Sequence, residues 1–206
     1  MTLRTLHFPD SFRPQQVAAA GGRLWVLGAG STSASKACAL WEVTPSTLAT
    51  RAFALPDCPT DVAAGNGEVY LLVNAVEGET NTRAYHVEVF DPSTGLAQVL
   101  APVVLQNVGS AVAHTDLTFG DGSLWLYGYA TGTPEVVRIA PGSGTVESTI
   151  VNAPPIGGLY PAVAADAVGA WLGGGPGGSA QLDWVPAGAT TARATSYVAP
   201  TANSAI

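Results

Sequence analysis

The chain has 206 residues, of which 47% are hydrophobic and only 11% charged, and its net charge is −7. Because about a quarter of the residues in an ordinary globular protein are charged, this composition favours a layered β protein with small side chains between its sheets. The single lysine, Lys36, and seven scattered arginines argue against a phosphate-backbone partner, so we expect no nucleic acid. No apolar run approaches the ~20 residues that span a bilayer, so we expect no membrane insertion.

The N-terminus lacks the charged, apolar and small-residue segments of a signal peptide. We expect an extracytoplasmic or secreted domain whose export signal is not in this chain, and a cytoplasmic protein is the alternative. The two cysteines form no Cys-x-x-Cys pair and no Cys/His cluster, which argues against a structural zinc site.

One aromatic residue recurs in a short apolar run that follows a Gly-rich or Asp-containing turn. The four positions are Trp25, Tyr70, Trp125 and Trp171, separated by 45, 55 and 46 residues. A period in this range indicates a repeat architecture.

In chain order, residues 1–9 come first and resemble the end of a repeat unit, so we interpret them as a spare outer strand. Each unit then begins with a strand of small residues and a tight turn that leads into the aromatic strand. The turns are Gly21-Gly22, Asn66-Gly67, Asp121-Gly122 and residues 166–169. Asn-Gly and Asp-Gly supply the positive φ angles that short hairpins require.

Each unit continues with a polar loop, an alternating third strand, a turn with proline and a fourth strand. The predicted third strands are residues 39–43, 85–89, 136–139 and 181–185. The prolines are Pro45, Pro92, Pro141 and Pro186. The predicted fourth strands are residues 48–55, 96–103, 145–152 and 191–199.

Four antiparallel strands per unit of ~45 residues predict an all-β protein, a single β-propeller domain over residues 1–206. The predicted blades are 16–56, 61–104, 115–153 and 161–200. Because the last blade already has a fourth strand, the spare strand favours an open arc, or part of a larger propeller, over a closed ring. An open arc would expose one blade face at each end and allow self-association.

Two segments carry a family resemblance: residues 62–70 (VAAGNGEVY) and 89–95 (VFDPSTG) resemble the streptogramin-lyase-like and NHL-type repeats of bacterial propellers. The resemblance covers nearly the whole chain and implies the propeller fold alone, because such repeats serve lyases, lactonases, binding modules, sensors and scaffolds. The related lyases use a His-containing metal site, and no motif in this sequence carries those residues over.

Candidate site residues lie in the loops that converge over the channel mouth of a propeller. Asp61 and Asp116 precede the first strands of units two and three in matching register, and His114 lies beside Asp116. Tyr160 precedes unit four, and Glu77 lies in a loop between second and third strands. We expect these five residues to bind a ligand, and Asp61, His114 and Asp116 are the catalytic candidates.

Two interpretations of these aspartates stay open. In one, they hold a divalent cation or act as acid and base with His114. In the other, they accept hydrogen bonds from backbone N–H groups in their own loops. The equivalent positions hold Gln16 in unit one and the Pro161-Ala162 pair in unit four, which weakens the first interpretation. We predict no resident cofactor, with a divalent cation as the alternative.

Four further side chains invite a functional interpretation. We expect His7 and His86 to be surface or packing residues. Trp41 and Trp184 lie at nearly equivalent positions of third strands, and we expect both in the core. The alternative is that these indoles are exposed and stack on sugars or peptide side chains.

Cys38 begins the third strand of unit one, and Cys58 follows its fourth strand. Because these strands are antiparallel neighbours, both thiols lie at one end of the blade and a disulfide is feasible. Two free buried thiols are the alternative.

Complete blade signals without a complete catalytic constellation favour a non-enzymatic module that binds or senses a protein or small-molecule ligand on the propeller face. The first alternative is an enzyme of the lyase or lactonase type with a metal at the channel mouth. The second is a structural arc that assembles with further blades or copies.

Overall fold

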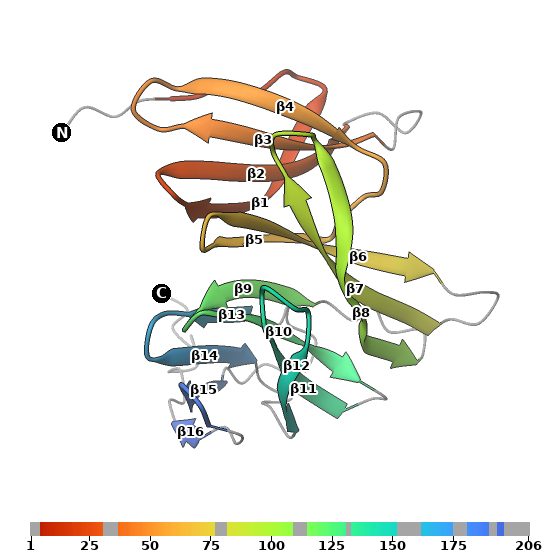
Figure 1. Cartoon of the computed structure of the whole chain (residues 1–206), viewed down its shortest axis with the longest axis vertical. Coiled ribbons are helices and arrows are strands. Elements are labelled where there is room, and N and C mark those ends of the chain that lie inside the picture. Colours follow the sequence, from red (N-terminus) through yellow and green to blue (C-terminus); the bar gives the residue numbers. More distant parts are fainter. Residues whose placement is uncertain are drawn as a thin grey trace, which may run out of the picture. The chain divides into compact units, whose positions relative to one another are not determined.

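The computed structural model describes residues 5–30, 37–76, 82–108, 115–130, 133–151, 162–174, 181–189 and 193–195. These residues form sixteen strands and no helix, and the strands make four four-stranded sheets in which neighbours follow chain order (Figure 1). The pairings are antiparallel throughout the recorded registers. In the described part of the chain there is therefore no helix of the length and apolarity that a membrane span needs.

Each sheet is one blade. Blade 1 contains β1 (Phe12–Ala20), β2 (Arg23–Gly30), β3 (Cys38–Thr44) and β4 (Ala49–Leu55). Blade 2 contains β5 (Asp61–Gly65), β6 (Glu68–Val76), β7 (Thr82–Asp91) and β8 (Leu96–Val108). Blade 3 contains β9 (Asp116–Gly120), β10 (Ser123–Ala130), β11 (Thr133–Ile139) and β12 (Val146–Val151). Blade 4 contains β13 (Ala162–Ala165), β14 (Gly169–Gly174), β15 (Gln181–Pro186) and β16 (Arg193–Thr195).

The fold is a four-bladed β-propeller, which confirms the predicted fold class. The chain forms two compact units, unit 1 and unit 2, which are not the four repeat units of the sequence. Unit 1 is Met1–Asn74 with Glu88–Gln98, and unit 2 is Ala75–Val87 with Val99–Ile206. Within unit 1, β1 lies beside β5, and within unit 2, β9 lies beside β13, as the first strands of neighbouring blades do. An open arc stays a prediction.

The hairpins between first and second strands have the backbone that their sequences predict. Asn66 and Gly67 have φ angles of 52° and 83°, and Asp121 and Gly122 have 51° and 68°. Two consecutive positive φ angles match the right-handed twist of the strands that they join. The aromatic residue therefore enters β6 and β10 at the same register.

A second recurring turn joins third and fourth strands. Leu48, Gly95 and Gly144 each donate a backbone N–H to the carbonyl four residues earlier, at 2.8 Å in every case. Their φ angles are 61°, 75° and 67°, so leucine occupies a left-handed position that the other blades give to glycine. A side chain in that region is strained by its own carbonyl group.

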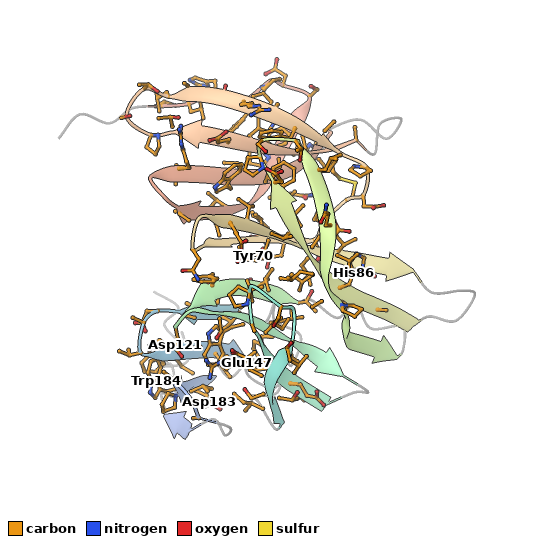
Figure 2. The ribbon with its side chains drawn as sticks, viewed as in Figure 1. Tyr70, His86, Asp121, Glu147, Asp183 and Trp184 are labelled. Atoms are coloured by element: carbon orange, nitrogen blue, oxygen red, sulfur yellow. A yellow bond between two sulfur atoms is a disulfide. The ribbon has the colours of Figure 1, made fainter. Side chains whose placement is uncertain are left out.

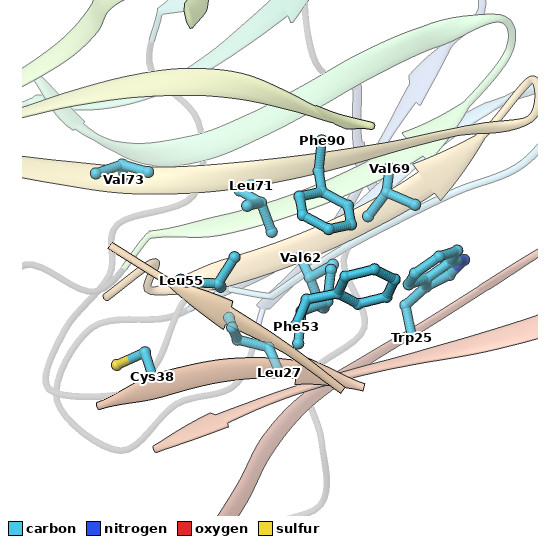
Figure 3. Packing of buried hydrophobic residues seen from close by; sticks show 11 residues of the cluster. Trp25, Leu27, Cys38, Phe53, Leu55, Val62, Val69, Leu71, Val73 and Phe90 are labelled. Atoms are coloured by element: carbon cyan, nitrogen blue, oxygen red, sulfur yellow. The ribbon is translucent and has the colours of Figure 1, made fainter. Parts of the chain in front are cut away.

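The core of unit 1 lies between blades 1 and 2 (Figure 3). Trp25 and Phe53 come from blade 1, Phe90 comes from blade 2, and their ring centroids lie 5.0–6.4 Å apart. Aliphatic side chains of both blades surround these rings: Leu27, Leu40, Leu55, Val62, Val69, Leu71 and Val73. Each blade buries here the face that it could not bury alone.

The core of unit 2 repeats this arrangement between blades 3 and 4. Blade 3 contributes Trp125, Tyr127, Val136 and Ile150, and blade 4 contributes Val163, Ala170, Leu172 and Val185. Trp125 also donates its indole N–H to the carbonyl of Gly120 at 3.0 Å, and the Arg138 guanidinium lies 4.7 Å from the centre of its ring. The repeated aromatic of one blade therefore packs on the aliphatic face of the next.

The segment interpreted as a spare strand is different. Residues 1–4 lie outside the described residues, and residues 5–9 form no strand. Instead, Phe8 and Phe12 pack on Trp41, with ring centroids 5.5 and 5.7 Å from its own. An aromatic contact, not a strand pairing, therefore fastens this segment to blade 1.

Candidate functional site

Asp61 is almost completely buried at the start of β5. Its Oδ1 atom accepts the backbone N–H of Val62 at 2.8 Å. A buried carboxylate requires such donors, because desolvation of an unpaired charge is costly. In this geometry the side chain shapes its own strand entry, which is the alternative that the sequence left open.

Asp116 occupies the matching position of blade 3 and accepts a hydrogen bond from the next blade. Its Oδ2 atom lies 2.6 Å from the backbone N of Val163. Because Val163 is the second residue of β13, this charge-assisted bond ties the first strands of blades 3 and 4 together inside unit 2. Asp116 thus links blade 3 to blade 4, whereas Asp61 bonds within its own strand.

The other candidate residues of the channel mouth, His114, Tyr160 and Glu77, lie outside the described residues. Asp61 belongs to unit 1 and Asp116 to unit 2, and each is described in its own unit. Within the described ranges, no three His, Cys, Asp or Glu side chains group as metal ligands would. The convergent site stays a prediction.

Unit 1 has a shallow groove of about 390 Å³ beside the turns of blade 2, lined in part by Glu68, Phe90, Asp91 and Thr94. Both carboxylates are engaged locally. Tyr70 donates its phenol to Glu68, while Ser93 and Thr94 donate to Asp91 at 2.7–3.0 Å. Burial, with help from Glu68, raises the pKa of Tyr70 far above its usual range, and the hydrogen bonds from Ser93 and then Thr94 lower the pKa of Asp91. The polar groups of this groove serve its own turns.

The two cysteines are bonded to each other. Cys38 and Cys58 form a disulfide with Cα atoms 5.2 Å apart and 20 residues of separation. The bond ties the start of β3 to the segment after β4, as the antiparallel arrangement of these strands predicts. It closes the outer half of blade 1.

The most distinctive exposed surface lies on blade 4, and we call it the blade-4 outer face: Ala164, Trp171, Leu182 and Trp184. Trp171 and Trp184 are direct partners in the pairing of β14 with β15, and their ring centroids lie 4.8 Å apart. Trp171 is 40% exposed, whereas its equivalents Trp25, Tyr70 and Trp125 are 5%, 0% and 0% exposed. The residue that forms the core in three blades lies on the surface of the fourth.

Glycines on both sides of Trp171 shape this face. A Cβ atom on Gly169 would lie 2.2 Å from the carbonyl oxygen of Val185 and 2.9 Å from the ring of Trp184. Gly173, two residues after Trp171, likewise adds no side chain to the same face. The two indoles therefore lie over bare backbone, which leaves their rings open to a partner.

Trp41 and Trp184 are not equivalent, which corrects the sequence interpretation. Trp25 pairs with Glu42 and Trp171 pairs with Trp184, so Trp184 corresponds to Glu42 and lies one residue out of register with Trp41. One residue of shift places a side chain on the opposite face of a sheet. Figure 2 labels Asp183 and Trp184, neighbours on β15 of which Asp183 is buried and Trp184 is half-exposed. Neither tryptophan is fully buried, although both were expected in the core.

His7 is exposed and His86 is half-buried on β7, as expected of surface or packing residues. The sequence analysis kept an exposed Trp184 as an alternative but missed the exposure of Trp171 and its pairing with Trp184. The alternation Gly169-Ala170-Trp171-Leu172-Gly173 was its signal, because it places the one large residue that this segment gives to that face between two glycines.

The protein matches no family model and no curated protein sequence. Among solved structures it is similar to the β-propeller domain of the Trilobed protease from Pyrococcus furiosus, with a TM-score of 0.58 and 10% identity over 92% of this chain and 59% of that one. It is also similar to a GH43_1 enzyme from Xanthomonas citri, with a TM-score of 0.56 and 14% identity over 89% of this chain and 74% of that one. A GH43 endo-arabinanase from Bacillus licheniformis has a TM-score of 0.50 and 15% identity, over 86% and 72% of the two chains.

These similarities define the protein as a β-propeller protein and go no further, because identities of this size show the fold alone. The chain spans 59% of the length of the Pyrococcus furiosus domain.

Proposed function

We propose that this protein is a non-enzymatic propeller module that binds another protein through the blade-4 outer face. The observation that carries the proposal is the pair of exposed Trp171 and partly buried Trp184, whose ring centroids lie 4.8 Å apart over glycine backbone. Tryptophan is enriched in the energetic centres of protein interfaces, because it buries a large apolar area and has few rotamers to order. Charged side chains are depleted from such centres. The four residues of this face carry none, and the charged residue Arg193 pairs with Trp184 at the outer edge of the face.

The engaged aspartates support a non-enzymatic function. Asp61 and Asp116 accept backbone hydrogen bonds inside their own units, at 2.8 and 2.6 Å. A lyase or lactonase with a metal at the channel mouth would need these carboxylates as ligands or bases. The two GH43 enzymes among the similar structures make enzymatic activity the natural test of this proposal.

We also propose an extracytoplasmic location. Disulfides persist in oxidising compartments and are rare in the reducing cytosol. Both cysteines of this chain form one disulfide. Partial proteolysis of intact and lysed cells that express the native gene tests this location. Protection of the protein in intact cells with a permeabilised outer layer would contradict it.

Two measurements test the function. In the first, the full chain is assayed on lactones, aryl arabinosides and lyase substrates with and without divalent cations. We expect no turnover. Turnover that Asp61→Asn or Asp116→Asn abolishes, while the circular dichroism stays unchanged, would contradict the proposal.

In the second, the immobilised full chain is offered secreted and surface proteins of the source cells. We expect retention of a protein by the wild type and by Val99→Glu, which alters an exposed valine on another blade, and loss of that protein with Trp171→Glu. Equal retention by all three proteins would show that the blade-4 outer face is not the binding surface.

A further inference from the structure

Two exposed faces of this chain are complementary halves of one type of interface. Inside each unit, the aromatic of one blade packs on an aliphatic residue of the next blade's first strand. Trp25 packs with Val62 in unit 1, and Trp125 packs with Val163 in unit 2. Trp171 presents the aromatic half of this contact on the surface.

The aliphatic half is exposed on blade 1. Val17 directly precedes Ala18, the residue that pairs with Trp25. Val62, Leu117 and Val163 stand at the same position: each directly precedes the residue that pairs with the repeated aromatic of its blade. Those three equivalents are 3%, 3% and 7% exposed, whereas Val17 is 64% exposed. We call Val17, Ala19 and Leu24 the blade-1 outer face, since Ala19 and Leu24 pair directly beside Val17.

The N-terminal aromatic cluster leaves this face open. Phe8 and Phe12 pack on Trp41. The Phe12 ring also lies against Gly28, since a Cβ atom added to Gly28 would be 2.5 Å from that ring. Gly28 is two residues beyond Val26 on β2, away from Leu24. Trp41 pairs with Val26, the partner of Val17, so the cluster lies on the same face as Val17 and covers the part toward β3 and Gly28. Val17 and Ala19, on β1, stay exposed.

We infer that the blade-4 outer face of one copy docks on the blade-1 outer face of a second copy of this chain, as successive blades dock within a unit. This inference rests on the proposed function and names its partner. The occupant is argued from the repeat itself. Among the described residues, the chain exposes an aromatic face, and it also exposes the aliphatic face that packs with such an aromatic elsewhere in the fold.

The geometry of such a contact is head-to-tail. Unlike patches meet, so association continues until a ring closes or a filament forms. Because each copy has a net charge of −7 and the two faces are apolar, added salt should screen the repulsion between copies and strengthen association. A contact that depended on ion pairs would weaken instead.

Sedimentation velocity of the full chain over a wide concentration range tests the inference. We expect species larger than one copy at high concentration. Trp171→Glu and Val17→Glu should each raise the dissociation constant more than about tenfold, as loss of a central interface residue does. Val99→Glu is the matched control, because Val99 is 59% exposed on β8 and should leave association unchanged. Circular dichroism and melting temperature check that each variant folds.

The decisive arm mixes the two variants. Val17→Glu retains the blade-4 outer face and Trp171→Glu retains the blade-1 outer face, so an equimolar mixture should form a two-copy species and nothing larger. Trp171→Ser replaces Trp171→Glu if the acidic variant fails to fold.

Three results would overturn the inference. The first is a wild type that stays a single copy at all concentrations, as a chain whose blade 4 closes on its own blade 1 would. The second is undiminished association of Val17→Glu alone, which would indicate contact between two identical blade-4 faces. The third is an equimolar mixture of the two variants in which both proteins stay single copies. If the wild type is single yet a foreign protein requires Trp171 for binding, the proposed function stands and this inference falls.

Discussion

Trp125 and Trp171 occupy the same position in consecutive blades of unit 2 and have opposite environments. Trp125 is fully buried, donates its indole N–H to Gly120 and lies under the Arg138 guanidinium. Trp171 is 40% exposed and lies beside another indole. The difference shows that in a repeat fold the neighbouring blade, and not the local sequence, decides whether the same residue serves as core or as surface.

The largest expected effect is the loss of stability when the buried tryptophan of this pair, Trp125, is replaced. Trp125→Ala should lower the free energy of unfolding by roughly 3–5 kcal/mol, because it opens a cavity between blades and orphans the Gly120 carbonyl. Trp171→Ala should cost clearly less, since Trp171 is 40% exposed and its removal opens no cavity between blades. Urea unfolding at low protein concentration measures both, and equal losses would contradict the account.

The second-largest expected effect is the loss of stability when the disulfide of blade 1 is reduced. Reduction of Cys38–Cys58 should destabilise blade 1 by roughly 3 kcal/mol, because the bond constrains a loop of about 20 residues in the unfolded chain. Thermal unfolding with and without reductant measures this. The double variant Cys38→Ser/Cys58→Ser is the control and should melt like the reduced protein, with no further response to reductant.

The clamp between blades 3 and 4 should have a smaller effect. Asp116→Ala removes the acceptor of the Val163 N–H and should cost about 1–2 kcal/mol. Gln16→Ala is the matched control: it alters the equivalent position of blade 1, which is exposed, and should change stability by less than about 0.5 kcal/mol. If Asp116→Ala left the free energy of unfolding unchanged, Asp116 would have no structural role, and the enzyme alternative would be open again.

The smallest effect is a gain of stability. Leu48→Gly should stabilise blade 1 by about 0.5–1 kcal/mol, because a left-handed φ of 61° strains leucine more than glycine's flexibility costs. Gly95→Ala, at the matching turn of blade 2, should destabilise the protein. Melting temperatures of the two variants should therefore move in opposite directions.

The sequence was sufficient for the blades because each turn carries its own chemistry. Asn66-Gly67 and Asp121-Gly122 require positive φ angles, and these turns align the aromatic strands. The spare strand could not be predicted correctly, because residues 5–9 have strand-like composition but are held by the rings of Phe8, Phe12 and Trp41.

The candidate site was harder to predict for a physical reason. A recurring aspartate is equally suited to bind a cation and to accept a backbone N–H, and only the position of Val163 relative to Asp116 distinguishes the two. The exposed tryptophan pair depended on a one-residue difference in register between Trp41 and Trp184, which spacing along the chain does not resolve.

The central claim is that Trp171 is an interblade residue that becomes buried when a second copy docks. Fluorine NMR of the full chain labelled with 5-fluorotryptophan tests it most directly, with the resonance of Trp171 assigned through Trp171→Phe. At low concentration, we predict a solvent isotope shift for Trp171 and none for Trp125. At high concentration, the Trp171 shift should disappear in the wild type and persist in Val17→Glu. A Trp171 resonance that is protected at every dilution, or exposed at every concentration, would contradict the account.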